Sequence, residues 1–262
     1  LYELVLHDGS ISGQKKEVLF QCYPCKSPAD EAAFLAGILL FTTERTFIKR
    51  NAQTKELLAQ GRLSPIIRDY VLDSVIPKPC KWFCGRTKEL EQLHALLEAE
   101  GKVFLFGIAG IGKSELAKAY AAQYRQFYTN ILYLTYSGDL MKDITDMDFV
   151  DDLPTDSQRE RFRKHNQFLR SLKEDTLFVI DNFNSTETQD DFLSIVLKYR
   201  CHILFTTRSK IAGRTDYLLE EISDREALFG LFTHFYSEAQ THRPIVEQII
   251  EAVHSHTFAV EL

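Results

Sequence analysis

The chain has 262 residues and a formal net charge of −6, with 45% hydrophobic and 26% charged residues. These values are typical of a globular protein with room for one large α/β domain and a small companion. The charge argues against a broad nucleic-acid-binding face, and no apolar run approaches the ~20 residues that span a bilayer. Because the chain begins at Leu1 and has no signal-peptide pattern, we expect a piece of a larger cytoplasmic protein.

The first 79 residues predict a small α+β unit. Leu1 to Tyr23 has the pattern of a β-hairpin, and Ser27-Pro28 and Ser64-Pro65 each have the pattern of a helix start. Pro77 and Pro79 mark a linker after it. The sequence does not disclose the function of this unit.

The five cysteines suit a reducing compartment, since their number is odd. Cys22, Cys25, Cys80 and Cys84 together could supply four thiolates to zinc. Small buried hydrophobic side chains are the favoured interpretation, because neither pair sits in a glycine-containing knuckle.

The next elements predict a phosphate-binding loop. A helix is expected over Thr87 to Glu98, a buried strand over Lys102 to Phe106, and a helix over Glu115 to Gln123. Between strand and second helix lies G-x-x-x-x-G-K-[ST], a loop that cradles the phosphates of a nucleoside triphosphate. Its expected nucleotide-binding residues are Gly107, Gly110, Gly112, Lys113, Ser114 and Glu115. Lys113 would reach the β- and γ-phosphates, and Ser114 would offer its hydroxyl to Mg²⁺.

A second strand is expected over Asn130 to Thr135, and a helix over Asp156 to Leu172. The segment 137–155 between them is acidic and rich in turn residues, which predicts an exposed surface rather than a metal site.

Asp181 ends a run of four apolar residues, Leu177 to Ile180, which predicts a strand buried on both faces. Ligands bind at the carboxyl edge of such sheets, so Asp181 is expected to meet the Mg²⁺ held by Ser114. Asn182 follows, where many P-loop ATPases have a carboxylate that activates water. Because an amide cannot take a proton from water, we expect slow hydrolysis.

The remaining elements are a helix over Asp191 to Tyr199, a strand from His202 to Phe205, and a short strand over Tyr217 to Leu219. The polar end of the second of these, Thr206-Thr207-Arg208, would place Arg208 near the γ-phosphate. A capping box beginning at Ser223 predicts a helix to Phe235, and Pro244 opens a last helix with Ile245, Ile249 and Val253 as its apolar residues. His254 and His256 are interpreted as surface or packing residues rather than metal ligands.

Five motifs in this order resemble those of the STAND signalling ATPases, which include the NB-ARC and apoptotic-ATPase-like proteins. They are Phe83-Cys-Gly-Arg86-x-x-Glu89-Leu90, the phosphate loop, Leu177 to Asn182, Ile203 to Arg208 and Ala227-Leu-Phe229. The resemblance covers roughly residues 80 to 262.

The resemblance implies a P-loop NTPase three-layer sandwich with a mainly parallel sheet over 80–221, followed by a helical subdomain over 222–262. It also implies a switch: ADP holds a closed monomer, and exchange to ATP, triggered by a sensor ligand, opens it for self-association and contact with an effector. Phe83 and Arg86 would lie near the adenine and ribose, and Arg208 would be the sensor arginine. The family's usual Gly-x-Pro is replaced by His254 to Phe258, a segment that contains no proline.

Two other classes remain open. A P-loop phosphotransferase would need a lid carrying arginines, for which Arg159, Arg161 and Arg163 form the one available cluster; they are expected to form an exposed helix face instead. An AAA+-type ATPase would need an arginine finger acting on a neighbouring subunit, and a DNA-binding version would need a basic face, which the net charge disfavours.

Overall fold

The computed structural model describes residues 76–149, 152–186 and 189–256. The expected hairpin, the two N-terminal helices, Cys22 and Cys25 lie outside these residues. The chain divides into two compact units, 1–73 with 148–157 and 74–147 with 158–262. The elements that follow belong to the second unit.

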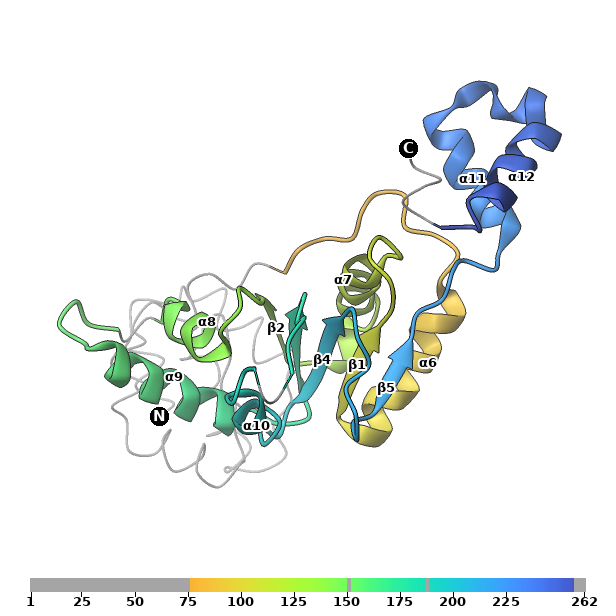
Figure 1. The fold of residues 1–262 in the computed structure, drawn as a ribbon. Helices are drawn as coiled ribbons and strands as arrows, with labels where there is room; N and C mark the ends of the chain where they lie inside the picture. The colour runs from red at the N-terminus through yellow and green to blue at the C-terminus, as the bar shows by residue number, and fades with distance from the viewer. Residues whose placement is uncertain (1–75, 150–151, 187–188, 257–262) are drawn as a thin grey trace, which may run out of the picture. The chain divides into compact units, whose positions relative to one another are not determined.

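Five parallel strands form the sheet, in the order β2-β3-β4-β1-β5 (Figure 1). They are β1 (Lys102–Phe106), β2 (Asn130–Thr135), β3 (Thr176–Asp181), β4 (His202–Thr207) and β5 (Asp216–Leu218). The prediction of a P-loop α/β sandwich with a mainly parallel sheet is confirmed. Every residue of β3 and β4 is buried, as expected for strands covered on both faces.

Alternation along the strands divides the apolar side chains between the two faces of the sheet. Val103 and Leu105 of β1 join Val179 of β3 in a core with the helices α6 (Thr87–Glu100) and α7 (Lys113–Gln123). On β1 and β4 the intervening residues Phe104 and Phe205 stack with ring centroids 4.3 Å apart. Two-sided burial therefore holds the carboxyl ends of these strands in fixed positions.

The other helices are α8 (Leu140–Asp146), α9 (Gln158–Ser171), α10 (Leu193–Val196), α11 (Arg225–Phe235) and α12 (Arg243–Ala252), with 3₁₀ turns at Arg125–Phe127 and Ser237–His242. The expected helix from Asp191 to Tyr199 is thus only one turn long. Among the described residues, no helix has the length and apolar character that crossing a membrane requires.

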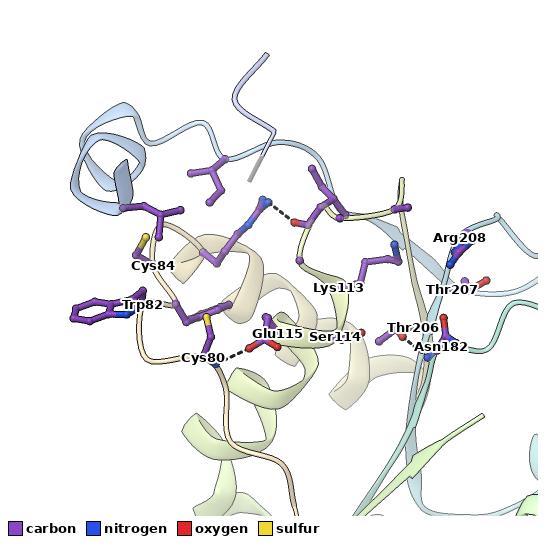
Figure 2. Close-up of a pocket in the computed structure, with 18 of the residues that line it drawn as sticks. Cys80, Trp82, Cys84, Lys113, Ser114, Glu115, Asn182, Thr206, Thr207 and Arg208 are labelled. Atoms are coloured by element: carbon purple, nitrogen blue, oxygen red, sulfur yellow. Dashed lines mark hydrogen bonds between the residues drawn. The ribbon is translucent and has the colours of Figure 1, made fainter. Parts of the chain in front are cut away.

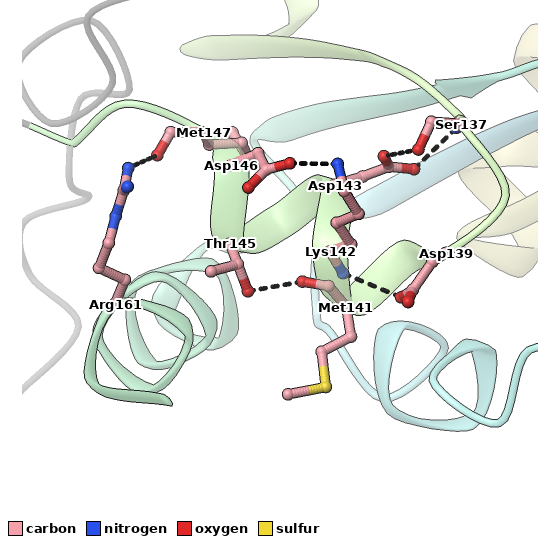
Figure 3. Close-up of polar contacts among 9 residues, drawn as sticks. All are labelled: Ser137, Asp139, Met141, Lys142, Asp143, Thr145, Asp146, Met147 and Arg161. Carbon is pink, nitrogen blue, oxygen red and sulfur yellow. Dashed lines mark hydrogen bonds and ion pairs between the residues drawn. The ribbon is translucent and has the colours of Figure 1, made fainter. Parts of the chain in front are cut away.

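The expectation of an exposed acidic loop over 137–155 is wrong in part, because α8 lies within it (Figure 3). Asp139 caps this helix by accepting the backbone N–H of Lys142 at 2.9 Å. Asp143 is buried, and its carboxylate accepts both the backbone N–H and the hydroxyl of Ser137. Two of the acidic residues are therefore structural, and no cluster with metal-ligand chemistry occurs within the described part of the chain.

A separate apolar cluster lies in the C-terminal helices. It contains Ile222, Leu228 and Leu231, together with Val246 and Ile250 of α12. The expected inward residues Ile245 and Ile249 are instead exposed, since the buried stripe of α12 is offset by one residue. The N-cap of α11 is Asp224 rather than Ser223, and its carboxylate accepts the N–H of Ala227 at 3.0 Å.

Candidate functional site

A cavity of about 320 Å³ lies at the carboxyl ends of the strands, against the loop between β1 and α7 (Figure 2). The register of the sheet explains which side chains meet there. Phe106 pairs with Thr207, which brings Arg208 beside the loop, and Ile180 pairs with Phe205, which brings Asp181 beside Thr206. Residues separated by a hundred positions in the sequence therefore face one cavity.

Lys113 is the first residue of α7 and reaches back over the loop. Its Nζ donates to the carbonyl oxygens of Gly107 at 2.8 Å and Ile108 at 2.7 Å. Burial, and then the positive charge of Arg208, lower the pKa of Lys113, while the carboxylate of Asp181 acts in the opposite direction. The positive charges of Lys113 and Arg208 repel each other at a partly buried site. A bound anion would stabilise the charged form of both side chains.

Ser114 and Thr206 both donate to the same carboxylate oxygen, Oδ1 of Asp181, at 2.8 and 2.5 Å. Asp181 and Thr206 are buried at the tips of adjacent strands. The hydroxyl and the carboxylate that the sequence assigned to Mg²⁺ therefore lie in direct contact, and of the two residues Ser114 lines the cavity.

Two glycines of the loop are required for different reasons. A Cβ on Gly107 would lie 2.7 Å from the carbonyl oxygen of Leu219, so the loop passes too close to the chain after β5 for any side chain. Gly112 caps α7 with a φ of 101°, a conformation that L residues rarely adopt, although space is open around it. Together they keep the backbone exposed at the amino end of α7, where its N–H groups and dipole favour an anion.

The side chains after β3 and β4 are linked across the strand tips. Asn182 has a φ of 63° and donates its backbone N–H to Thr206 Oγ1 at 2.8 Å. Asn184 Nδ2 donates to Asn182 Oδ1 at 2.6 Å, and Asn184 Oδ1 accepts the backbone N–H of Arg208 at 2.9 Å. Asn184 was not predicted from the sequence. A polar residue two positions after a strand-end Asn was the signal available.

Phe83 and Arg86, which the family resemblance places near the adenine and ribose, also line the cavity. The guanidinium of Arg86 is buried and donates to the carbonyls of Glu220 at 2.7 Å and Ile111 at 3.2 Å, and to Glu89 at 2.8 Å. It therefore joins the segment before α6, the phosphate loop and the end of β5.

Further lining residues were not identified from the sequence. Cys80, Trp82 and Cys84 precede α6, while Ile222 and Leu231 come from the C-terminal helical cluster. Glu115 accepts the N–H of Cys80 at 2.6 Å and pairs with Lys118 at 2.7 Å, so its carboxylate fixes the linker beside the loop. Only the folded chain brings these segments together.

The donor set fits a phosphate group and a hard cation. The amino end of α7 and Lys113 offer donors, and Ser114 with Asp181 offers the oxygen ligands that Mg²⁺ prefers. The hydroxyl of Tyr133 on β2 is buried beside the carboxylate of Asp181, and no hydrogen bond of standard geometry satisfies it among the described residues. Burial and the carboxylates of Asp181 and Glu115 raise its pKa, so it remains a donor near the site.

Solved structures similar to this chain are P-loop ATPases at low sequence identity. Cdc6p from Pyrobaculum aerophilum is 15% identical over 61% of this chain and 50% of that one, with a TM-score of 0.39. AMPPCP-bound DnaA from Aquifex aeolicus is 14% identical over 68% and 59%, with a TM-score of 0.42. A RuvB mutant from Thermotoga maritima is 14% identical over 71% and 64%, with a TM-score of 0.43. The chain thus spans between half and about two thirds of these proteins. A comparison with curated proteins finds no match.

A family model gives the decisive comparison. The NB-ARC domain matches residues 86–227, which is more than half of the chain. The match begins at Arg86 and includes the phosphate loop, Asp181 and Arg208. With the parallel sheet and the phosphate loop at its carboxyl edge, this chain belongs to the NB-ARC family of nucleotide-binding P-loop domains.

Proposed function

We propose that this chain is the ATP/ADP-dependent switch of a STAND-type signalling or defence regulator. It binds the nucleotide with Mg²⁺ in the cavity beside the phosphate loop, and it hydrolyses ATP slowly. Hydrolysis and exchange change the arrangement of the domain, and the ATP form self-associates. A sensor ligand and a downstream effector act through parts of the protein that the described residues do not include.

The observation that carries the proposal is the composition of the cavity wall. Lys113, Ser114 and Arg208 come from the α/β core, whereas Ile222 and Leu231 come from the helical cluster. A nucleotide held by the residues of the α/β core would also contact those of the helical cluster. The number of its phosphates, two in ADP or three in ATP, can therefore bias how the core and the helical cluster pack. Affinity that differs between two arrangements is what a ligand needs to shift their populations.

The roles of the residues follow from their contacts. Lys113 would exchange two loop carbonyls for phosphate oxygens, and Arg208 would bind the terminal phosphate, so that both cations gain a counter-charge. Ser114 and Asp181 would hold Mg²⁺, which supplies charge neutralisation at the phosphates. Asn182 supports slow turnover, because an amide cannot act as a general base toward water. Its amide oxygen also already accepts a hydrogen bond from Asn184.

No described contact favours the phosphotransferase alternative. The arginines that would form its lid lie on α9, and Arg161 donates to the carbonyl of Met147 at 3.4 Å (Figure 3). None of the three is among the residues that line the cavity.

The test is nucleotide binding by Lys113→Ala. We expect ATP with Mg²⁺ or ADP to raise the unfolding temperature of the wild type by several degrees, and the variant to show no shift while keeping its own transition. The matched control is Lys142→Ala, which removes an exposed lysine paired with Asp146. Equal stabilisation of wild type and Lys113→Ala would contradict the assignment. Steady-state turnover of many ATP per second by the isolated protein would favour an ordinary enzyme over a switch.

A further inference from the structure

Side chains from three separate parts of the chain bind the backbone carbonyls of the phosphate loop. Lys113 and Arg86 are two of the donors. The third is His256, whose Nε2 lies 3.0 Å from the carbonyl oxygen of Ala109, 147 positions earlier in the sequence. Because a carbonyl oxygen only accepts, the proton of this hydrogen bond must be on Nε2.

The end of α12 directs His256 toward the loop. The backbone N–H of Ser255 donates to the carbonyl of Ile250 at 2.9 Å, and that of His254 donates to Glu251 at 3.0 Å. This pair of hydrogen bonds is the Schellman arrangement that ends many helices. The path of the chain into His256 is therefore fixed by hydrogen bonds of the helix itself.

The turn uses a conformation that its side chains disfavour. His254 and Ser255 have φ values of 52° and 57°, in the left-handed region where glycine is the usual residue. Two such residues in succession each cost about 1–2 kcal/mol, so they persist where surrounding contacts hold them. The contact of His256 with Ala109 is one such contact beyond the helix.

The hydrogen bond to the carbonyl of Ala109 affects the orientation of the peptide group that joins Ala109 to Gly110 in the loop. In a trans peptide the carbonyl and the following N–H point in opposite directions, and the described residues contain no cis peptide. A donor on the carbonyl of Ala109 therefore sets the direction of the N–H of Gly110. Gly110 has a φ of 78° and lines the cavity, so the orientation of this peptide decides whether its amide faces a phosphate.

We propose that His256 is a positioning residue of the phosphate loop, supplied by the segment after α12. It holds the Ala109–Gly110 peptide in one orientation and so favours an anion in the cavity. The inference rests on the proposed nucleotide site and adds a second link between that site and the helical cluster. It goes beyond the interpretation of His256 as a surface or packing residue.

Reciprocity follows from this link. If the contact forms best when the loop is in its anion-binding arrangement, His256 strengthens nucleotide binding. Bound nucleotide then increases the equilibrium constant for forming the His256 contact by the same factor. Lys113 leaves its loop carbonyls when it binds phosphate, whereas His256 and Arg86 keep theirs. The loop would then be held by donors from outside its own helix.

The test compares His256→Ala and His256→Gln with His254→Asn in the full chain. Glutamine can place an N–H donor near the same carbonyl, and His254→Asn changes the exposed neighbouring histidine to a residue that tolerates a positive φ. We expect ADP to bind His256→Ala roughly 3- to 10-fold more weakly than wild type, the loss of one hydrogen bond, with at least partial recovery in His256→Gln. His254→Asn should bind like wild type.

Amide hydrogen exchange without nucleotide provides an independent readout. We expect faster exchange at residues 109–112 in His256→Ala but not in His254→Asn. Wild-type affinity in His256→Ala, or equal weakening by His254→Asn, would overturn the inference. If the wild type binds no nucleotide, the proposed function fails instead, and the exchange at 109–112 decides whether His256 holds the loop.

Discussion

Asn182 shows how a single side chain limits the chemistry of the site. Its left-handed backbone and its hydrogen bonds to Thr206 and Asn184 fix it at the tip of β3, directly after Asp181. The position suits a residue that orients water, but a neutral amide cannot accept the proton that water releases. We therefore expect bound ATP to be hydrolysed slowly, so that the ATP complex is long-lived, as a switch requires.

Asn182→Asp should raise steady-state ATP hydrolysis by about 10-fold or more, since general-base catalysis contributes roughly 10²–10⁴-fold. Aspartate tolerates the same backbone conformation and keeps an acceptor for Asn184. Phosphate release under saturating ATP and Mg²⁺ measures the effect. Asn184→Ala serves as the control, because it frees the amide at position 182 without adding a base. Unchanged or slower turnover in Asn182→Asp would show that the missing carboxylate is not what limits the rate.

At the scale of elements, Arg86 ties the segment before α6 to the phosphate loop and to the residues after β5. Its guanidinium joins the residue before α6 to the phosphate loop at Ile111 and to the end of β5 at Glu220. Removing it leaves two carbonyls and Glu89 without their buried donor.

We expect Arg86→Ala to lower the free energy of unfolding by about 3–5 kcal/mol, the cost of breaking a buried charged pair. Arg86→Lys should recover part of this, because one ammonium cannot reach all three acceptors in the same geometry. Arg225→Ala, which changes an exposed arginine, is the control. Denaturant unfolding measures the differences, and a loss below about 1 kcal/mol would contradict a structural role for the buried guanidinium.

A partly buried chain of hydrogen bonds links α6, α7 and β4 on the side away from the cavity. His94 Nδ1 bonds Tyr120 at 2.9 Å, Tyr120 bonds Tyr128 at 2.8 Å, and Tyr128 bonds His202 Nδ1 at 3.2 Å. Burial raises the pKa of Tyr128 to about 12, so its phenol is neutral at physiological pH. Three bonds need three protons and the phenols supply two, so one imidazole Nδ1 must supply the third.

This network predicts a pH dependence of stability. Burial lowers the pKa of His202 below its ordinary value of 6.5, although Glu98 and Glu174 oppose the shift. The unfolded chain therefore binds a proton more readily, and stability should fall as the pH drops below about 6.5, until the lowered pKa is passed. Thermal unfolding between pH 7.5 and 5.5 should show a smaller loss for His202→Gln than for wild type. His242→Gln, at an exposed site, should follow the wild type. Parallel curves for all three proteins would contradict this assignment.

At the scale of the whole described unit, the cavity lies between two apolar clusters. The larger one contains the sheet with α6 and α7, and the smaller one contains α11 and α12. Cys84 donates to the carbonyl of Ala227 at 3.5 Å, and the rings of Trp82 and His234 stack. A ligand in the cavity would add to these few contacts.

Hydrogen exchange over 225–252 should therefore slow when ADP binds. At about 100 times its dissociation constant, ADP adds about 2.7 kcal/mol to the free energy of unfolding, and we expect the helical cluster to share in that protection. Lys113→Ala with ADP is the control and should exchange like the nucleotide-free wild type. Exchange over 225–252 that ignores ADP, while the loop at 107–114 is protected, would show that the helical cluster does not sense the nucleotide.

Much of the α/β core could be predicted from the sequence. The expected bounds of β1 and β2 agree with the structure, and the apolar run before Asp181 is a strand with every residue buried. The prediction of β3 succeeded because burial on both faces leaves an uninterrupted apolar run. Lys113 and Ser114 could be proposed as site residues because the phosphate loop is a local motif, and Asp181 because it ends an apolar run; their roles stay predictions.

The tertiary structure decided the features that depend on strand register and on packing. Asp143 is buried because α8 forms and Ser137 binds its carboxylate, which composition alone did not suggest. Ile222 and Leu231 line the same cavity as the phosphate loop, from which they are more than a hundred positions distant in the sequence. His256 forms its hydrogen bond with Ala109 over a similar distance along the chain. Local sequence determines the chemistry of each segment. Which segments meet is decided by how the strands align and where the helices find apolar surface to cover.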